Sequence, residues 1–441
     1  MFNSLISTAQ RAKAQRAINL LLGDCRRLLS ERGQSNGVAI ASALIAELAQ
    51  LDRVGQRLFF ERLAADLGPD PAAVLGRAQD YAQEQSAANL IALVQAAEPP
   101  RQELLRRING APGGTAAIVQ LRSALLDHLR ANPDLRAVDA DLLHLLSSWF
   151  NPGFLELRRV DWNSPAQLLE ELIRHEAVHA IDGWNDLRRR LQPDRRCFAF
   201  FHPQLPGRPL IFVEVALLSK MPEAIAPLID QHATPLPPRT YKVAAFYSIS
   251  NCEPGLRGVS LGNFLIKRVA EELKRELPKL STFCTLSPIP GFMNWLAGNS
   301  VLSDLSAQAA LKPKRRAELI NGHALLLRSC DGDLRALAGA RAIECLDALE
   351  RSAQEALLAL CAAYLALLAP GPAGDPVARF HLDNGARLER LNPRADLSKN
   401  GLRQSAGMMV NYLYDLGRIE ANHEQFKNGV VAHSRAIAAQ L

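Results

Sequence analysis

Apolar residues over the first 150 positions recur about every 3.6 residues, which is the spacing of successive amphipathic helices. Stretches rich in Gly and Pro interrupt this spacing, and no run of β-branched residues appears. The interruptions fall at 33–37, 68–71, 99–100 and 110–114. We therefore predict an all-α domain over residues 1–150, a helical bundle used for assembly, and we find no chemistry in it.

The pattern changes after Trp149, where the turn Asn151-Pro152-Gly153 opens a region of mixed strands and helices. Short apolar runs predict strands at 197–201, 210–218, 243–250 and 282–286. Helical spacing returns at 261–277 and again over 302–368, which we interpret as a helical insertion. The expected fold class is α+β, with a mixed-sheet domain over residues 151–441.

Composition and charge narrow the classes of partner. The 441-residue chain is 48% apolar and 22% charged, as globular proteins are, and no apolar run approaches the roughly 18–20 residues of a membrane span. A net charge of +6 and a pI near 9.0 suit an anionic ligand such as a phosphate ester or coenzyme A. We expect no nucleic-acid partner, since no aromatic-interleaved basic stripe is present, and no membrane partner.

The cysteines and the N-terminal residues bear on location. Seven cysteines are scattered without a CxxC pair, which indicates reduced thiols in a cytoplasmic protein. Residues 1–23 carry three basic residues and no acidic one, a slight likeness to a transit peptide, but we interpret them as a surface helix. An apolar core with a small-residue cleavage site is missing, so we do not expect secretion.

The first candidate site is a glycine-punctuated loop, residues 253–260, between the predicted strand 243–250 and the predicted helix 261–277. Backbone N–H groups at a helix N-terminus favour an anion, because the donors are unpaired and the helix dipole is positive there. Gly258 and Gly262 would let the backbone approach a phosphate closely. A tight turn without a ligand explains such glycines equally well.

Two polar residues lie where predicted strands end. Ser287 follows the strand 282–286 and begins a rigid loop with two prolines and a glycine, although a serine before a proline is ordinarily a turn residue. The runs 377–382 and 386–391 flank Asp383-Asn384-Gly385 and predict a β-hairpin. His381 lies on its first strand, on the face opposite the apolar residues, and a solvated surface histidine is the alternative.

The stretch His175-Glu176-Ala177-Val178-His179 matches the H-E-x-x-H pattern of zinc peptidases, on a predicted helix. The extended pattern requires Gly and His where this chain has Asp182 and Asn185, so a third ligand is missing. Glu214 lies in a strand-like run, which is a poor context for that ligand. We interpret the two histidines as helix-face residues and expect no metal site.

The chain contains several long motifs in a fixed order: Phe246-Tyr247-Ser248-Ile249-Ser250, residues 255–268, Leu286-Ser287-Pro288-Ile289-Pro290-Gly291-Phe292, Phe380-His381-Leu382-Asp383-Asn384-Gly385-Ala386 and Asn411-Tyr412-Leu413-Tyr414. Together these motifs resemble the malonyl-CoA decarboxylase family. Residues 176–179 and Arg195-Arg196-Cys197 also resemble the family, which makes the zinc-like pattern incidental. The resemblance covers most of residues 160–441 and is weaker in the helical part.

The resemblance implies a helical domain used in oligomerisation and a catalytic domain with the fold of the acetyl-CoA-dependent N-acetyltransferases (GNAT). In that fold the loop before the helix holds the coenzyme A pyrophosphate, here Arg257, Gly258, Val259, Ser260, Leu261, Gly262 and Asn263. The family's serine and histidine fall on Ser287 and His381, and a supporting tyrosine falls on Tyr414. Some relatives have a glutamate where this chain has Ser260, which leaves an acidic helper at that position in question.

The implied reaction converts malonyl-CoA to acetyl-CoA and carbon dioxide. Because the thioester carbonyl is itself an electron sink, we expect neither a metal nor an organic cofactor. His381 would donate a proton to the enolate, and Ser287 would hydrogen-bond the acyl group or relay that proton, although these two roles can be exchanged. Tyr414 would position His381 or the carboxylate. The expected assembly is a homo-oligomer, a dimer or a tetramer.

Three other interpretations stay open at this point. An acyl-CoA-dependent N-acyltransferase on the same fold would need an amine acceptor, whereas a decarboxylase makes acetyl-CoA from malonyl-CoA alone. A non-catalytic CoA-sensing scaffold would bind the ligand without turnover. A zinc peptidase would contain metal and lose activity to chelators.

Overall fold

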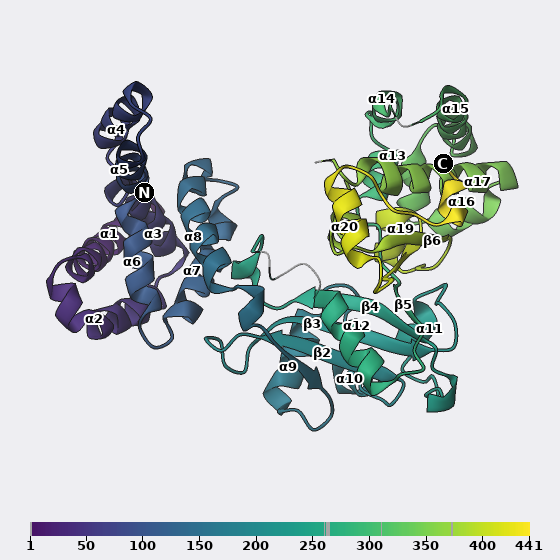
Figure 1. Ribbon diagram of the computed structural model, residues 1–441, viewed down its shortest axis with the longest axis horizontal. Helices are drawn as coiled ribbons and strands as arrows, with labels where there is room; N and C mark the ends of the chain where they lie inside the picture. The colour runs from purple at the N-terminus through teal and green to yellow at the C-terminus, as the bar shows by residue number, and fades with distance from the viewer. Residues whose placement is uncertain (1, 260, 262–264, 310, 372–373) are drawn as a thin grey trace. The chain divides into compact units, whose positions relative to one another are not determined.

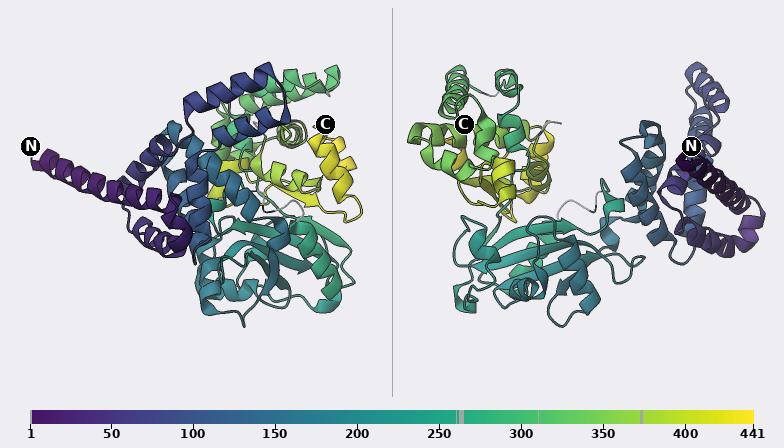
Figure 2. Two further views of the ribbon diagram at one scale, coloured as in Figure 1. Left: turned by 60° about the vertical axis from the view of Figure 1, so that its left-hand side comes forward. Right: turned by 180° about the vertical axis from the view of Figure 1, so that it is seen from behind.

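The computed structural model describes residues 2–259, 261, 265–309, 311–371 and 374–441 (Figures 1 and 2). The chain forms two compact units. The helical unit comprises Met1–Glu156, Phe201–Leu210 and Glu253–Leu261, and the sheet unit comprises Leu157–Phe200, Ile211–Cys252 and Gly262–Leu441. Two short pieces from the later sequence therefore belong to the helical unit.

Consecutive α-helices build the helical unit, as the 3.6-residue spacing predicted. They are α1 (Phe2–Leu29), α2 (Arg32–Leu48), α3 (Arg53–Asp66), α4 (Pro71–Gln83), α5 (Ala87–Ala97), α6 (Pro100–Asn109), α7 (Gly114–His128) and α8 (Arg136–Trp149). Their apolar faces meet in a core in which Phe59, Phe60 and Leu104 are almost completely buried. A buried ion pair between Arg101 and Asp141, 2.5 Å long, joins α6 to α8.

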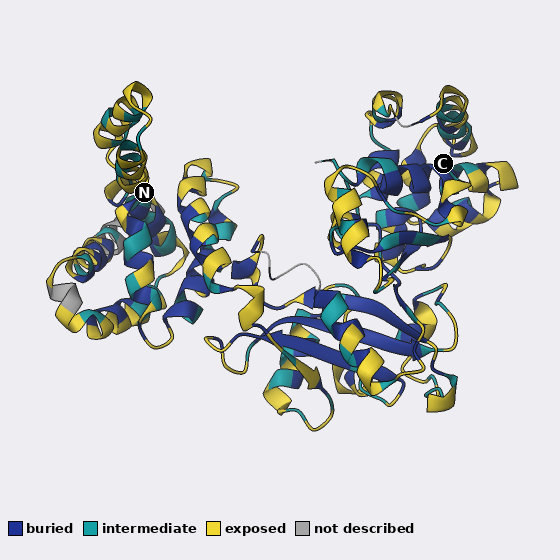
Figure 3. Cartoon of the chain, in the orientation of Figure 1, coloured by how far each residue is buried: buried dark blue, intermediate teal, exposed yellow. Residues whose placement is uncertain are grey.

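The hairpin of α4 and α5 differs from the other helices of this unit. Its two helices pack against each other, and neither contains a fully buried residue (Figure 3). On α5, the side chains of Leu90, Ile91 and Val94 are 44%, 57% and 60% exposed. These three residues lie on one helical face, because they are spaced at i, i+1 and i+4. The hairpin thus presents an apolar face to solvent.

A short 3-10 helix, η4 (Pro254–Leu256), joins the helical unit by packing on α7. The guanidinium of Arg122 donates to the carbonyls of Gly255 and Arg257, at 2.8 and 2.7 Å. A β-carbon on Gly255 would lie 1.9 Å from the carbonyl oxygen of Val119, so only glycine allows this approach. The start of the predicted anion loop is therefore fixed to α7.

A mixed seven-stranded sheet, ordered β1-β2-β3-β4-β5-β7-β6, forms the frame of the sheet unit. Its strands are β1 (Glu156–Val160), β2 (Arg195–Phe201), β3 (Pro209–Leu218), β4 (Val243–Asn251), β5 (Thr282–Thr285), β6 (Arg387–Asn392) and β7 (Met409–Leu413). β4 pairs antiparallel with β3 and parallel with β5, while β7 pairs antiparallel with β5 and β6. The four strands predicted between residues 197 and 286 are confirmed, and β2 to β5 are largely buried (Figure 3).

Helices connect and cover these strands. α12 (Leu265–Glu276) precedes β5 and buries Leu265, Val269 and Leu273, as its apolar spacing predicted. The others are α9 (Ala166–His175), α10 (Gly183–Arg190), α11 (Ala226–Ile229), α13 (Phe292–Leu296), α14 (Val301–Ala307), α15 (Pro313–Ser329), α16 (Ala342–Ala348), α17 (Arg351–Ala363), α18 (Pro376–Asp383), α19 (Lys399–Ser405), α20 (Ile419–Lys427) and α21 (Arg435–Ala438). The helical insertion predicted over 302–368 is confirmed, and so is the α+β fold class.

Helix α17 continues into a π-helical turn, η6 (Tyr364–Leu368). Within the described part of the chain, Arg351–Leu368 is the one helical stretch whose length and apolarity would allow it to cross a membrane. The stretch is 56% buried inside the protein, and α17 packs against α15. Such burial is what a core helix of a folded domain shows.

The β-hairpin predicted around Asp383-Asn384-Gly385 is wrong in its first half. Residues 376–383 form α18, because Asp375 caps the first turn and Pro376 occupies the first helical position. Gly385, at φ +78°, then ends the helix with the left-handed residue common at helix C-termini. Only the second predicted run is a strand, β6.

The helix predicted through the H-E-x-x-H stretch is also wrong, because α9 ends at His175. The carboxylate of Glu176 accepts hydrogen bonds from the backbone N–H groups of Val178 and His179, both 2.8 Å long. This local capping turns the chain away from the helix axis. His175 and His179 therefore do not share a helical face.

Candidate active site

A cavity of about 250 Å³ opens in the sheet unit where β4 and β5 separate. The two strands are paired from Val243–Thr282 to Phe246–Thr285, and the N–H of Leu286 donates to the carbonyl of Phe246 at 3.0 Å. The register of β4 with β3 also shifts there, and the shift leaves Tyr247 as a bulged residue. The lining residues are Val178, Ile211, Phe246, Tyr247, Ser248, Ile249, Asn251, Ser287, Pro288, Pro376, Val377, Phe380 and His381.

Ser287 lies just beyond the end of β5 and is held there by β7. Its N–H donates to the carbonyl of Val410 at 2.8 Å, and its carbonyl accepts from the N–H of Val410 at 3.0 Å. The side chain is 5% exposed, and its Oγ lies 2.9 Å from Oγ1 of Thr285. Both backbone groups of Ser287 are thus engaged, which leaves its hydroxyl as the group that faces the cavity.

His381 occupies the last turn of α18 and is buried, with 3% of its surface exposed. Its Nε2 lies 3.0 Å from Oγ of Ser287, and its Nδ1 lies 2.9 Å from the hydroxyl of Tyr414. The imidazole also stacks on the ring of Tyr412, with 4.7 Å between centroids. Both ring nitrogens and one ring face are therefore fixed, which excludes the solvated surface histidine considered above.

Tyr414 directly follows β7, and its N–H donates to the carbonyl of Phe283 in β5 at 2.8 Å. Burial raises the pKa of its phenol well above the usual value, so the hydroxyl keeps its proton. The three predicted residues Ser287, His381 and Tyr414 thus form one chain of hydrogen bonds. Thr285 extends that chain at the serine end, and its Oγ1 also accepts from the N–H of Tyr412 at 3.2 Å.

The imidazole of His381 is neutral in the free protein. Burial lowers its pKa from the ordinary value near 6.5 to about 3. A neutral imidazole donates through one nitrogen and accepts through the other. In one tautomer Tyr414 donates to Nδ1 and Nε2–H donates to Ser287, and in the other both bonds reverse. A proton can therefore be held or passed along the chain in either direction.

We compared the sequence with family profiles. A family profile described as the malonyl-CoA decarboxylase C-terminal domain matches residues 153–441, and one described as the N-terminal domain matches residues 67–150. This chain belongs to the malonyl-CoA decarboxylase family. The family and the enzyme class expected from the sequence, a carboxy-lyase, are confirmed.

Individual relatives and solved structures support the same family assignment. The mitochondrial malonyl-CoA decarboxylases of Mus musculus and Anser anser anser are each 38% identical, over 80% and 74% of this chain. The chain spans 75% of the mouse protein and 66% of the goose protein. Crystal structures of malonyl-CoA decarboxylases from Rhodopseudomonas palustris and Agrobacterium vitis share 47% and 45% identity, with TM-scores of 0.83 and 0.80. Those matches cover 96% and 95% of this chain and 99% of each solved chain.

The predicted phosphate loop of this malonyl-CoA decarboxylase family member is described in part. Arg257, Gly258, Val259 and Leu261 belong to the helical unit, whereas Ser260, Gly262 and Asn263 lie outside the described residues. Gly258 has a φ of +83°, which side chains rarely adopt. The N–H of Val259 donates to the carbonyl of Leu256 at 2.9 Å, which closes a tight turn before the loop continues.

Within the H-E-x-x-H stretch, Glu176 contacts the wall of the cavity. Besides its two backbone donors, Glu176 accepts a 2.6 Å hydrogen bond from the hydroxyl of Ser248, which lines the cavity. His175 Nε2 lies 2.9 Å from Glu171 instead of facing His179. Over the ranges that the structure describes, no group of three His, Cys, Asp or Glu residues is placed to hold a metal ion.

Three residues of the site were not among those predicted from the sequence. Thr285 and Tyr412 contact the serine–histidine pair through tertiary packing, which leaves no local signal in the chain. Asp375 could have been found, because Asp375-Pro376 before an apolar run is the signature of a helix start. That signature would also have placed His381 on a helix.

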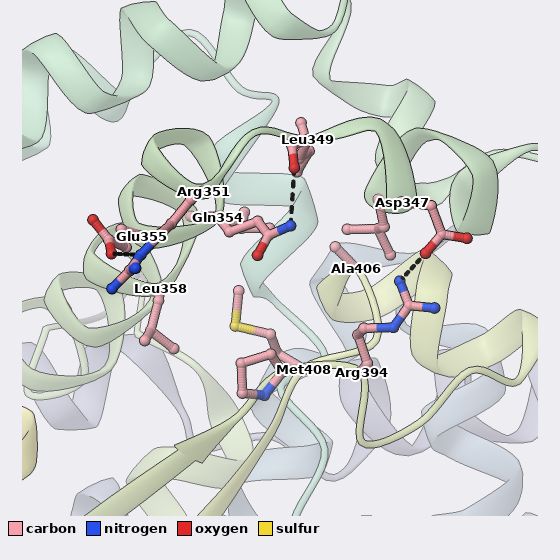
Figure 4. Close-up of a pocket in the computed structure, with 12 residues that line it drawn as sticks. Asp347, Leu349, Arg351, Gln354, Glu355, Leu358, Arg394, Ala406 and Met408 are labelled. Atoms are coloured by element: carbon pink, nitrogen blue, oxygen red, sulfur yellow. Dashed lines mark hydrogen bonds and ion pairs between the residues drawn. The ribbon is translucent and has the colours of Figure 1, made fainter.

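A larger cavity of about 500 Å³ lies elsewhere in the sheet unit, between α16, α17 and residues 393–408 (Figure 4). Its charged residues pair with one another, Arg351 with Glu355 at 2.9 Å and Arg394 with Asp347 at 2.6 Å (Figure 4). None of the described residues predicted for the site lines it. The smaller cavity beside Ser287 and His381 is therefore the candidate active site of this decarboxylase-family chain.

The depressed pKa of His381 predicts how stability depends on pH. Below pH 6.5 the unfolded chain protonates this histidine and the folded chain does not, so the free energy of unfolding should fall as the pH decreases from 6.5 toward 3. The expected contribution is about 1.4 kcal/mol per pH unit. His381→Asn should lack it, so urea denaturation at pH 5, 6 and 7 should give a shallower pH dependence for the variant. Equal slopes for the two proteins would contradict a buried neutral imidazole.

Proposed function

We propose that this protein converts malonyl-CoA to acetyl-CoA and carbon dioxide in the cavity between β4 and β5. The observation that carries the proposal is the hydrogen-bonded chain of Ser287, His381 and Tyr414, whose first two members line that cavity. The names of the relatives support the substrate. An N-acyltransferase would also need an amine acceptor, whereas the decarboxylation needs malonyl-CoA alone.

Bond cleavage requires that the carboxylate lose its charge as neutral carbon dioxide. The electron pair of the carbon–carbon bond then moves into the thioester carbonyl and gives an enolate. No Lys, Arg, Asp or Glu occurs among the residues described as lining the cavity. Such a lining favours the cleavage, because the substrate carboxylate loses water on binding and meets no permanent cation from a Lys or Arg side chain.

The enolate oxygen needs hydrogen-bond donors aimed at it. The hydroxyl of Ser287 has a single proton, which this proposal gives to C2. The candidate donors to the enolate oxygen are therefore backbone N–H groups of β4 beyond Phe246, where the register with β5 has ended. The bulge at Tyr247 redirects the backbone in this segment, as bulges beside active sites do.

His381 supplies the proton in this proposal. Burial is the cause of its low pKa, and a malonyl carboxylate bound in the same cavity would favour the imidazolium. His381 therefore takes up one proton as the substrate binds. After carbon dioxide has left, Nε2–H donates to Ser287, and the serine hydroxyl donates its own proton to C2 of the enolate. Tyr414 holds Nδ1 throughout.

The loop of residues 257–263 binds the pyrophosphate of coenzyme A in this proposal. Arg122 holds the carbonyl of Arg257 toward α7. Across a trans peptide the N–H of Gly258 is antiparallel to that carbonyl, so it points away from α7. A backbone donor exposed in this way, beside a glycine with positive φ, is the element from which anion-binding nests are built.

The same proposal includes a homo-oligomer, with residues 1–150 as its assembly domain and residues 151–441 as the catalytic domain. The support is the apolar face of α5, whose 11 residues carry no charge. A face of Leu90, Ile91 and Val94 is suited to pack against its counterpart on a second copy. All seven cysteines are free thiols, which supports a reducing, cytoplasmic location.

One prediction of this proposal tests the serine–histidine pair. His381→Asn removes the proton donor, and Ser287→Ala removes its relay, so each should lower kcat about 100- to 10,000-fold. The double variant should lose much less than the product of the two, because residues that act as a unit are non-additive. The assay follows acetyl-CoA and carbon dioxide from malonyl-CoA alone, without an amine acceptor.

Two controls accompany that experiment. Binding of a non-reactive malonyl-CoA analogue should survive in all three variants, which separates chemistry from affinity. His232→Asn, the same change at an exposed histidine of the sheet unit, should leave kcat unchanged. Near-normal turnover of His381→Asn would rule out the proposed proton donor.

The second prediction tests the phosphate loop. Gly258→Val places a branched side chain at a φ of +83° and blocks approach of a phosphate to the backbone, so the Kd for CoA should rise about 10- to 100-fold. The matched control is Gly332→Val, at a φ of +85° in the sheet unit, which should bind CoA normally. Calorimetric titration measures both. An unchanged Kd in a folded Gly258→Val protein would refute the assignment.

The third prediction concerns assembly. Ile91→Glu puts a charge on the apolar α5 face and should shift the protein to a smaller mass in light scattering after gel filtration. Val430→Glu, which alters a side chain of the same 57% exposure in the sheet unit, should keep the wild-type mass. If Ile91→Glu also keeps that mass, the α5 face is not the contact between copies.

A further inference from the structure

Asp375 joins the two chain segments that carry the serine–histidine pair. One carboxylate oxygen accepts from the N–H groups of Val377 and Ala378, both 3.0 Å away, in the first turn of α18. The other oxygen accepts from the N–H of Gly291, at 2.9 Å. Gly291 ends the rigid loop that begins at Ser287, and α18 carries His381. A single side chain therefore touches both segments.

The environment of this carboxylate is unusual for a helix cap. Other caps of this chain, such as Asp333, lie at the surface, whereas Asp375 is completely buried. Its described hydrogen-bond partners are three backbone N–H groups, with no Lys or Arg among them. A buried carboxylate without a cation is costly unless its oxygens are well hydrogen-bonded. Helix capping alone does not require such burial.

The loop is built to reach this carboxylate. A β-carbon on Gly291 would lie 3.3 Å from Oδ2 of Asp375 and 2.2 Å from the hydroxyl of Tyr364, so glycine is needed for the approach. Behind it, Tyr364 packs against the rings of Phe292 and Trp295, with centroids 5.8 and 5.2 Å apart. Tyr364 and Asp375 therefore both pack closely against Gly291 at the end of the loop.

We propose that Asp375 is a positioning residue that sets the distance between Ser287 and His381. The inference rests on the proposed function of that pair. The pair is separated by 94 positions in the chain, and α18 is not part of the sheet. Tyr412 and Tyr414 hold the imidazole of His381 against β7. Asp375 adds a link between the backbone of α18 and the loop that begins at Ser287. A misplacement of about 1 Å can cost about 100-fold in rate, so a three-bond link between the two segments acts directly on turnover.

The decisive variant is Asp375→Asn. An amide keeps one oxygen for the N–H groups of Val377 and Ala378, so the cap of α18 survives. Its NH₂ group then faces the N–H of Gly291, donor against donor, and the link to the loop is lost. We expect kcat for malonyl-CoA to fall about 100-fold while KM changes less than threefold. Asp333→Asn, the same change at an exposed cap in the same unit, should leave both constants unchanged.

A second measurement separates positioning from a general loss of structure. In a Ser287→Ala background, Asp375→Asn should lower the remaining kcat less than threefold, since it acts only through the pair. A purely structural residue would lower kcat by the same factor in both backgrounds. If Asp375→Asn is recovered unfolded, Asp375→Ser, which keeps a capping hydroxyl and is too short to reach Gly291, carries the same expectations.

The outcomes separate this inference from the proposed function. A folded Asp375→Asn protein with wild-type kcat overturns the positioning role, and so does an undiminished 100-fold loss in the Ser287→Ala background. If Ser287→Ala and His381→Asn themselves keep full activity, the proposed function fails instead. A 100-fold loss in the wild-type background alone supports both.

Discussion

The pair of backbone hydrogen bonds between Ser287 and Val410 is the constraint on which the site depends. These bonds continue the pairing of β5 with β7 beyond the last paired residues of β5 and β4. The separation of β5 from β4 opens the cavity within the sheet, and the pairing with β7 fixes Ser287 against a buried strand. Pro288 restricts the backbone of the preceding Ser287 further, and hydrogen bonds to Thr285 and His381 hold its hydroxyl in place.

His381 is held in place by different contacts from those that hold Ser287. Ser287 is fixed by strand hydrogen bonds, whereas His381 is fixed by a helix cap, a stacked ring and the Tyr414 hydroxyl. Burial lowers the pKa of the imidazole and keeps it neutral in the free protein. In the mechanism that we propose, the charge of the substrate, and not a resident carboxylate, sets the protonation state of His381.

The strands and helices were predictable where their periodicity is local, as for β4, β5 and α12. The element that carries His381 was not, because alternating apolar residues before Asp383-Asn384-Gly385 also fit a hairpin strand. The deciding feature was the cap by Asp375, whose local signature was overlooked. Contacts of Thr285 and Tyr412 with the pair were beyond reach, because they join segments that are far apart in the sequence and meet only in the folded sheet.

The separation of Ser287 and His381 by 94 residues also has a consequence for folding. The helices of the insertion lie between these two residues in the sequence, so their hydrogen bond closes a long loop. This hydrogen bond adds no net stability until the entropy cost of ordering that loop has been met. Contacts of such high sequence separation form late in folding. A newly made chain should thus acquire most of its helices before it acquires a working site, and local opening of the insertion would uncouple the pair without unfolding the sheet.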